Sequence, residues 1–367
     1  MSFFYDYKSY LTEPSRYAGL DWLRAFACLA VVLFHYMNIN DISPIFHLGW
    51  MGVDLFFVLS GFLIGSILFS SMTNLQKQFS YGHFVKNRFL RIYPLFLFVF
   101  VVGALLKSAT LLSPEFWSEF LTAFGISFVM GQTMYQLFGI TINESIFGVE
   151  GSWTLVIEWY FYLLSPLLVW IVLKLDQWRA NYGLGLLMAL FLSGVLVRYL
   201  ILHPYPATDM NWHFAVAVRP PGRYDVLVAG LICAYAVFKK PDVSFGFLFA
   251  PFIIVATMIV SYLYLNPDLL FRADHLTREV IIYPLLAGIG FGCLLLATYK
   301  TTYAPVAINI LARLSYAMYL LHFVVIWASK HYGVSLNPVA YIGLVVGISL
   351  LANLFIEYPC LRLYKKR

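Results

Sequence analysis

Long apolar runs separated by short polar stretches make up most of this chain. A helix needs about 20 apolar residues to cross the hydrocarbon core of a bilayer. Runs of this scale lie at 20–38, 50–70, 92–111, 153–174, 183–202, 224–238, 247–266, 280–299, 308–329 and 338–357. The pattern therefore predicts an all-α integral membrane protein with ten transmembrane helices.

A shorter apolar segment at 118–131 contains Gly125 and Ser127, and its hydropathy alone leaves open whether it spans. The distribution of positive charge decides whether the segment spans, because short cytoplasmic loops collect Lys and Arg. If this segment does not span, one side receives Lys77, Lys86, Arg88, Arg91, Lys174, Arg179, Lys239, Lys240, Lys300 and the tail at 362–367. We therefore predict a short interfacial or half-inserted helix here and both termini in the cytoplasm.

This topology divides the chain into a cytoplasmic N-terminal segment at 1–19, a transmembrane domain at 20–359 and a basic cytoplasmic tail at 360–367. A content of 61% hydrophobic residues and a mean hydropathy of +0.79 exclude a set of soluble domains. The net charge of +6 forms no dense basic stretch before the tail, so nucleic acid is not an expected partner. The four cysteines stand singly, so we expect no metal site, and no permanently bound cofactor.

Charged residues inside the predicted spans are the main functional signal, because each is costly unless it faces protein or water. In the first span, Arg24 and His35 are eleven positions apart. At 100° per residue they lie within about 20° of one face and roughly 16 Å apart. Asp21 can pair with Arg24 from the preceding turn. One helical wall thus carries an arginine near the cytoplasmic end and a histidine toward the outer end.

Other ionisable residues are expected in the outer half of the bundle with His35, namely Asp54, Glu158, Arg223 and Asp225. A histidine oriented by a carboxylate is suited to activating a hydroxyl as a general base. Either Glu158 or Asp225 can orient the imidazole, while the other binds the acceptor. The alternative for His35 is a buried histidine that hydrogen-bonds a neighbouring helix.

Glu158 lies in a span that begins after Gly151 and Ser152, a plausible N-cap. Tyr162, one turn further, continues a polar stripe for which interhelical hydrogen bonds are a sufficient explanation. His322, in the span at 308–329, is explained by packing, although it can line the same cavity as His35.

Arg88 and Arg91 lie one turn apart where the chain re-enters the membrane from the cytoplasm. Their ordinary role would be to anchor the helix at the interface by snorkelling. Guanidinium groups spaced along a helix can also clamp phosphate oxygens through forked hydrogen bonds. A cytosolic donor that carries phosphate would suit this pair.

Together these segments resemble the acyltransferase-3 family of integral membrane O-acyltransferases, whose bacterial members O-acetylate surface polysaccharides. The resemblance covers about residues 17–359. It rests on Arg24-x10-His35, GVDLFFVLSGFLIG at 52–65, Arg88-x-x-Arg91 followed by Tyr93-Pro94, SWTLVIEWYFYLLSP with Glu158, Arg223-Tyr224-Asp225 with Gly230, and SYAMYLLHFVV at 315–325.

The resemblance implies transfer of an acyl group, by default acetyl, from cytoplasmic acyl-CoA to a hydroxyl of an extracytoplasmic glycan or lipid-linked saccharide. It implies a catalytic His35, donor binding by Arg88 and Arg91, and a place for Arg24 on the donor path. The expected location is a bacterial inner membrane. Two features depart from the family pattern: Tyr358 stands where a basic residue is common, so we assign no role to Glu357, and no esterase-like domain follows the last span.

Two questions stay open at this stage. His35 can act as a base for direct transfer or carry the acyl group transiently, and the sequence does not separate these routes. The rival function is a proton-coupled transporter or exporter, because intramembrane carboxylates and histidines can also form a proton relay. Such a protein would have no evident use for Arg88 and Arg91.

Overall fold

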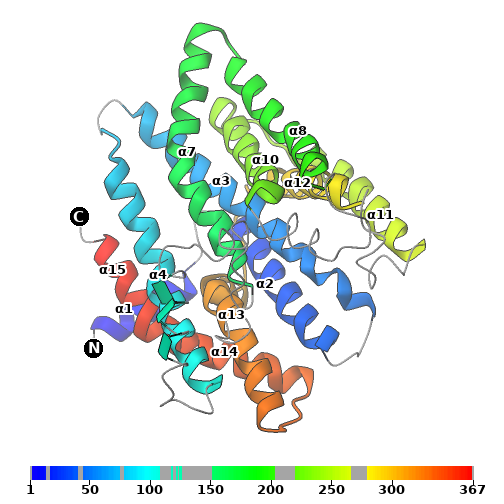
Figure 1. Cartoon of the computed structure of the whole chain (residues 1–367). Coiled ribbons are helices and arrows are strands. Elements are labelled where there is room, and N and C mark those ends of the chain that lie inside the picture. Colours follow the sequence, from blue (N-terminus) through cyan, green and yellow to red (C-terminus); the bar gives the residue numbers. More distant parts are fainter. Residues whose placement is uncertain are drawn as a thin grey trace.

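A computed structural model of the chain shows a bundle of helices (Figure 1). It describes residues 2–13, 17–39, 44–74, 78–107, 117–118, 121–122, 124–125, 151–202, 220–265 and 279–365. Within these ranges every regular element is a helix. The prediction of an all-α integral membrane protein is therefore confirmed.

Nine described helical segments are long and apolar enough to cross a membrane. They are α2 (Ala18–Ile39), α3 (Gly52–Thr73) with the preceding η1 (Pro44–Met51), α4 (Tyr81–Lys107), α7 (Trp153–Trp178), α8 (Tyr182–Leu202), α10 (Pro220–Lys239), α12 (Glu279–Thr298), α13 (Val306–His331), and α14 (Pro338–Ala352) with its continuation. The tenth expected span, 247–266, contains α11 (Phe249–Leu265), an apolar helix whose 17 described residues are at the lower limit of the length that crosses a bilayer. The helix expected at 118–131 lies outside the described residues apart from a few helical positions.

The N-terminal segment holds a helix that hydropathy does not reveal, α1 (Ser2–Thr12). Its Tyr7 hydroxyl donates to the Leu350 carbonyl at 3.3 Å, and its last carbonyl, that of Thr12, accepts from Asn309 of α13 at 3.1 Å. Asp6 pairs with Arg362 of α15 (Tyr358–Lys365) at 3.5 Å. Both ends of the described chain therefore lie together, and we call this the terminal end of the bundle.

Helix α3 lies at the centre of the larger group of helices, against α2, α7, α10 and α12. It approaches α10 so closely that a Cβ atom on Gly61 would lie 2.0 Å from the Leu227 carbonyl oxygen. A Cβ on Gly230 would lie 2.1 Å from that of Val58. Small residues allow this approach, which is a common way for membrane helices to associate.

A smaller core joins α1, α2, α13, α14 and α15. Between α14 and α15 the chain forms a π-helical turn, η7 (Asn353–Glu357). Such turns insert one extra residue and often occur at functional sites. This one ends with the buried Glu357 side chain, which faces α4.

Candidate active site

A cavity of about 820 Å³ lies at the terminal end, where the two groups of helices meet. Its walls come from α1, α2, α3, α4, α7, α13 and α15. Five arginines line it: Arg24, Arg88, Arg91, Arg313 and Arg362. The three arginines that the sequence singled out for the donor thus share one cavity.

Three of these arginines are held by carboxylates, among them Arg362 by Asp6 at 3.5 Å. Arg24 donates to Asp21 at 3.2 Å, the pairing that the sequence suggested. Arg91 pairs with Glu357 of the π-helical turn at 2.6 Å, and Asn353 donates to the same carboxylate at 2.7 Å. Glu357, to which the sequence gave no role, therefore positions a predicted donor-binding arginine.

Glu158 lines the same cavity as the arginines. It accepts hydrogen bonds from Ser60 of α3 at 2.6 Å and from Tyr162, one turn along α7, at 2.9 Å. This differs from the expectation that Glu158 lies beside His35. The rotation of α7 about its own axis, which hydropathy does not determine, turns the carboxylate toward the basic cavity. The Tyr162 hydroxyl donates to a carboxylate of its own helix, so this hydrogen bond does not join two helices.

His35 meets a second histidine instead of a carboxylate. His322 is fully buried, and its Nε2 lies 3.2 Å from Nδ1 of the half-buried His35. The Val31 carbonyl lies 3.0 Å from His35 Nδ1, and the Met318 carbonyl lies 3.3 Å from His322 Nδ1. The ring of Phe323 packs on both imidazoles, at 4.5 and 4.2 Å between ring centroids.

These contacts assign the hydrogens of the two rings. A carbonyl oxygen only accepts, so each Nδ1 donates its hydrogen to a carbonyl of its own helix. His322 Nε2 must then be an acceptor, and the one hydrogen on His35 Nδ1 is shared between the Val31 carbonyl and this nitrogen, since two donors would repel each other. His35 Nε2 makes no hydrogen bond to any described residue and is left as the nitrogen that can take a proton or attack a carbonyl carbon.

Tyr319 lies next to both the cavity and the histidine pair. It lines the cavity together with Thr154, whereas neither histidine does. The Tyr319 ring centroid lies 5.9 Å from that of His322. Its hydroxyl donates to the Gly151 carbonyl at 3.1 Å and accepts from Thr154 at 3.0 Å. The Tyr319 ring therefore links the basic cavity to the imidazoles.

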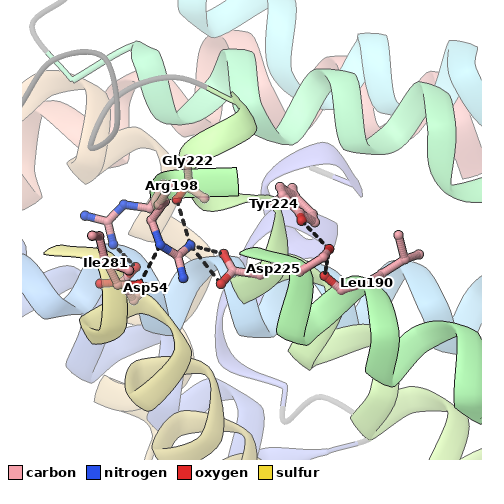
Figure 2. Close-up of polar contacts among 9 residues, drawn as sticks. Asp54, Leu190, Arg198, Gly222, Tyr224, Asp225 and Ile281 are labelled. Carbon is pink, nitrogen blue, oxygen red and sulfur yellow. Dashed lines mark hydrogen bonds and ion pairs between the residues drawn. The ribbon is translucent and has the colours of Figure 1, made fainter. Parts of the chain in front are cut away.

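The remaining predicted charges form a separate ion-pair network (Figure 2). Arg198 of α8, fully buried, donates to Asp225 at 2.8 Å and to the carbonyls of Gly222 and Ile281 at 3.1 and 2.8 Å. Arg223 pairs with Asp54 at 2.8 Å. Asp54 also accepts from Tyr283 at 2.8 Å.

This network corrects the role expected for Asp225. Asp225 does not orient His35, because Arg198 holds its carboxylate, and the network joins α3, α8, α10 and α12. Arg198 was not among the predicted site residues, although a lone arginine in the apolar run at 183–202 was a visible signal. Ser152 does occupy the N-cap of α7, but its side chain makes no capping hydrogen bond.

In the described ranges, no three His, Cys, Asp or Glu side chains come together as metal ligands would. The polar groups instead divide into a cationic cavity that can bind an anion and a histidine pair that can move a proton. The two are adjacent but not continuous. Such a division suits a reaction in which a charged carrier stays on one side and its cargo reacts on the other.

Comparisons with known proteins show the family to which the chain is similar. A family model described as an acyltransferase domain matches residues 17–357. O-acetyltransferase OatA of Staphylococcus aureus is 29% identical over 230 residues, which cover 61% of this chain and 35% of that protein. The putative peptidoglycan O-acetyltransferase YrhL of Bacillus subtilis is 32% identical over 197 residues, which cover 52% of this chain and 29% of that protein.

An uncharacterized protein of Haemophilus influenzae is 33% identical over 195 residues, 50% of this chain and 74% of that protein. The matches thus span only about a third of the length of the two O-acetyltransferases. No solved structure matches this chain.

Proposed function

The chain belongs to the acyltransferase family whose model matches it, and on that premise we propose that it is a membrane O-acetyltransferase. It would move an acetyl group from cytoplasmic acetyl-CoA to a hydroxyl of an extracytoplasmic glycan or lipid-linked saccharide. The observation that carries the proposal is the adjacency of the arginine-lined cavity to the His35–His322 pair: Tyr319, which lines the cavity, lies with its ring centroid 5.9 Å from that of His322.

The terminal end of the bundle is the cytoplasmic end in this proposal. This assignment rests on the positive-inside rule, by which short cytoplasmic connections collect Lys and Arg. The inner membrane of a bacterium is the matching location, since the O-acetyltransferases to which the chain is similar are bacterial. The histidine pair is then reached from the outer side by the acceptor.

The cavity would bind the donor through its phosphate groups. Arg88 and Arg91 offer forked donors to phosphate oxygens, and Arg24 lies on the path inward. The pantetheine arm would extend along Arg24 toward the Tyr319 ring. The separation of Arg24 and His35, roughly 16 Å along α2, is within the reach of an extended pantetheine.

His35 Nε2 can serve either of two routes. As a base it takes the proton of the acceptor hydroxyl, the oxygen attacks the thioester carbon, and the C–S bond breaks to release the CoA thiolate. As a nucleophile it attacks the thioester carbon itself, the C–S bond breaks to release the CoA thiolate, and an acyl-imidazole forms. The acceptor hydroxyl then attacks the acyl carbon, the N–C bond breaks, and the hydroxyl proton goes to the released imidazole nitrogen. His322 supports both routes, because its Nε2 accepts from His35 Nδ1 and so stabilises the positive charge that develops on the ring.

The acceptor class follows from the relatives alone. One is named a putative peptidoglycan O-acetyltransferase and another an O-acetyltransferase, so a cell-envelope glycan is the acceptor that we propose. The sugar and the acylated hydroxyl would be selected on the outer side of the histidine pair.

The proposal is tested with purified protein in nanodiscs, isotopically labelled acetyl-CoA and a soluble muropeptide acceptor. We expect His35→Ala to lower transfer by a factor of about 10² to 10⁴, the usual contribution of a general base. His331→Ala is the matched control, because that histidine is exposed at the end of α13. A wild-type rate of acetyl transfer by correctly folded His35→Ala protein would contradict the mechanism.

A further inference from the structure

Arg313 of α13 lines the basic cavity without a carboxylate partner among the described residues. The other three arginines whose partners are clear each have one: Arg24 with Asp21, Arg91 with Glu357, and Arg362 with Asp6. Arg313 therefore differs from the paired arginines, and its charge is available to a ligand.

The side chain is held in place by an aromatic ring instead. The guanidinium carbon of Arg313 lies 5.3 Å from the centre of the Tyr10 ring of α1. Its Nε is buried and makes no hydrogen bond in the described part of the chain. A cation packed over a ring in this way is stabilised by the electrons of the ring, while its hydrogen-bond donors stay unused.

A partly buried, unpaired guanidinium is costly, because removal from water is not offset by an opposite charge. An anion in the cavity removes that cost. The planar, forked donors of arginine match the oxygens of a phosphate group better than a single amine does. Tyr10 also lines the cavity, so α1 contributes one wall of this subsite.

We propose that Arg313, seated on Tyr10, binds a phosphate group of the acyl donor, as a subsite additional to Arg88 and Arg91. The ligand class is a nucleotide-bearing acyl carrier with more than one phosphate group. The inference rests on the proposed function, since it takes the cavity to be the donor site. It adds that α1 completes this site.

The test compares acetyl-CoA with acetyl-pantetheine, which carries the same thioester but no phosphate. Arg313→Gln should raise KM for acetyl-CoA at least about tenfold, because a hydrogen bond to a charged group contributes about 1.5 kcal/mol or more. It should leave the rate with acetyl-pantetheine unchanged. Arg313→Lys, which keeps the charge and loses the fork, should raise KM less. Arg179→Gln is the control, because that arginine is exposed at the same end and does not line the cavity.

Equal losses with both donors would mean that Arg313 only supports the fold, and an unchanged KM for acetyl-CoA would mean that it binds no phosphate. Either outcome overturns the subsite while the proposed function stands. Calorimetry with adenosine 3′,5′-bisphosphate tests the case in which the subsite exists but the proposed function is wrong. Binding that is weakened in Arg313→Gln, in a protein that does not turn over acetyl-CoA, would keep the subsite and overturn the proposed function. If the wild-type protein neither binds the bisphosphate nor turns over acetyl-CoA, both the subsite and the proposed function are wrong.

Discussion

His322 Nε2 accepts a hydrogen bond from His35 Nδ1 across 3.2 Å, between helices whose two histidines are 287 positions apart in the chain. A carboxylate usually holds a catalytic imidazole in this way. Here a neutral imidazole does so, and it is fixed in turn by the Met318 carbonyl of its own helix. We therefore propose the buried His322 as a positioning residue for His35.

Replacing His322 tests this positioning. Leucine removes the acceptor for His35 Nδ1, whereas glutamine keeps an amide oxygen that can accept. We expect His322→Leu to lower kcat at least about tenfold with little change in the KM for acetyl-CoA, from the loss of one buried hydrogen bond. We expect His322→Gln to retain more of the wild-type kcat. If the two variants have equal kcat values, the hydrogen bond does not matter and His322 only fills space.

Much of this site could be predicted from the sequence, but not which side chains pair with each other across helices. Helical periodicity and charge asymmetry were sufficient to bring Arg24, Arg88 and Arg91 to one end of the bundle. They could not show which helix faces which. The partner of His35 depends on how α2 and α13 are rotated about their axes, and no local pattern records that. Asp225 shows the same limit, because its partner Arg198 comes from another helix.

The Arg198–Asp225 pair should matter for folding. Removing one partner leaves a buried, uncompensated charge, which typically costs about 3–5 kcal/mol. We expect Arg198→Met to lower the thermal unfolding midpoint markedly, and Arg198→Met with Asp225→Asn to recover part of the loss. Midpoints measured in detergent for both single variants and the double variant form a complete cycle. Losses that simply add in the double variant would contradict the pairing.

The close approach of α3 and α10 should tolerate no side chain at Gly61. An alanine Cβ would lie 2.0 Å from the Leu227 carbonyl oxygen, so the two helices must separate. We expect Gly61→Ala to destabilise the protein by about 1–3 kcal/mol, the usual cost of overpacking.

Gly347→Ala on α14 is the matched control for this helix contact. Its Cβ would meet no described atom within 4 Å. There the greater helix propensity of alanine should leave stability unchanged or raise it by up to about 1 kcal/mol. The two variants are compared by thermal unfolding in the same detergent, and equal midpoints would show that the α3–α10 approach is looser than described.

Hydropathy found the spans of this fold because length and apolarity are what a bilayer selects. It missed α1 for the same reason, since a helix with Asp6, Lys8 and Ser9 has no such signal. That helix is stabilised by tertiary contacts, among them those of Tyr7 with Leu350 and of Thr12 with Asn309. Short polar helices of this kind can be recognised only from the structure.

Tyr319 should control whether the donor cavity stays separate from the histidine pair. Its ring lies next to both, so we propose that it is the layer between them, and its hydroxyl is fixed by Gly151 and Thr154. Tyr319→Ala opens that layer, so water from either side can reach the thioester beside His35. We expect the ratio of free acetate to acetylated acceptor to rise several-fold in this variant.

Tyr319→Phe keeps the ring and loses only the two hydrogen bonds. Because the ring, not the hydroxyl, closes the layer, we expect its acetate ratio to stay near that of the wild type. The lost bonds should cost about 1 kcal/mol each in stability. Free acetate and acetylated acceptor are measured together by isotope counting after separation. A wild-type ratio in both variants would show that the acetyl group does not pass Tyr319, and that the donor reaches His35 by another route.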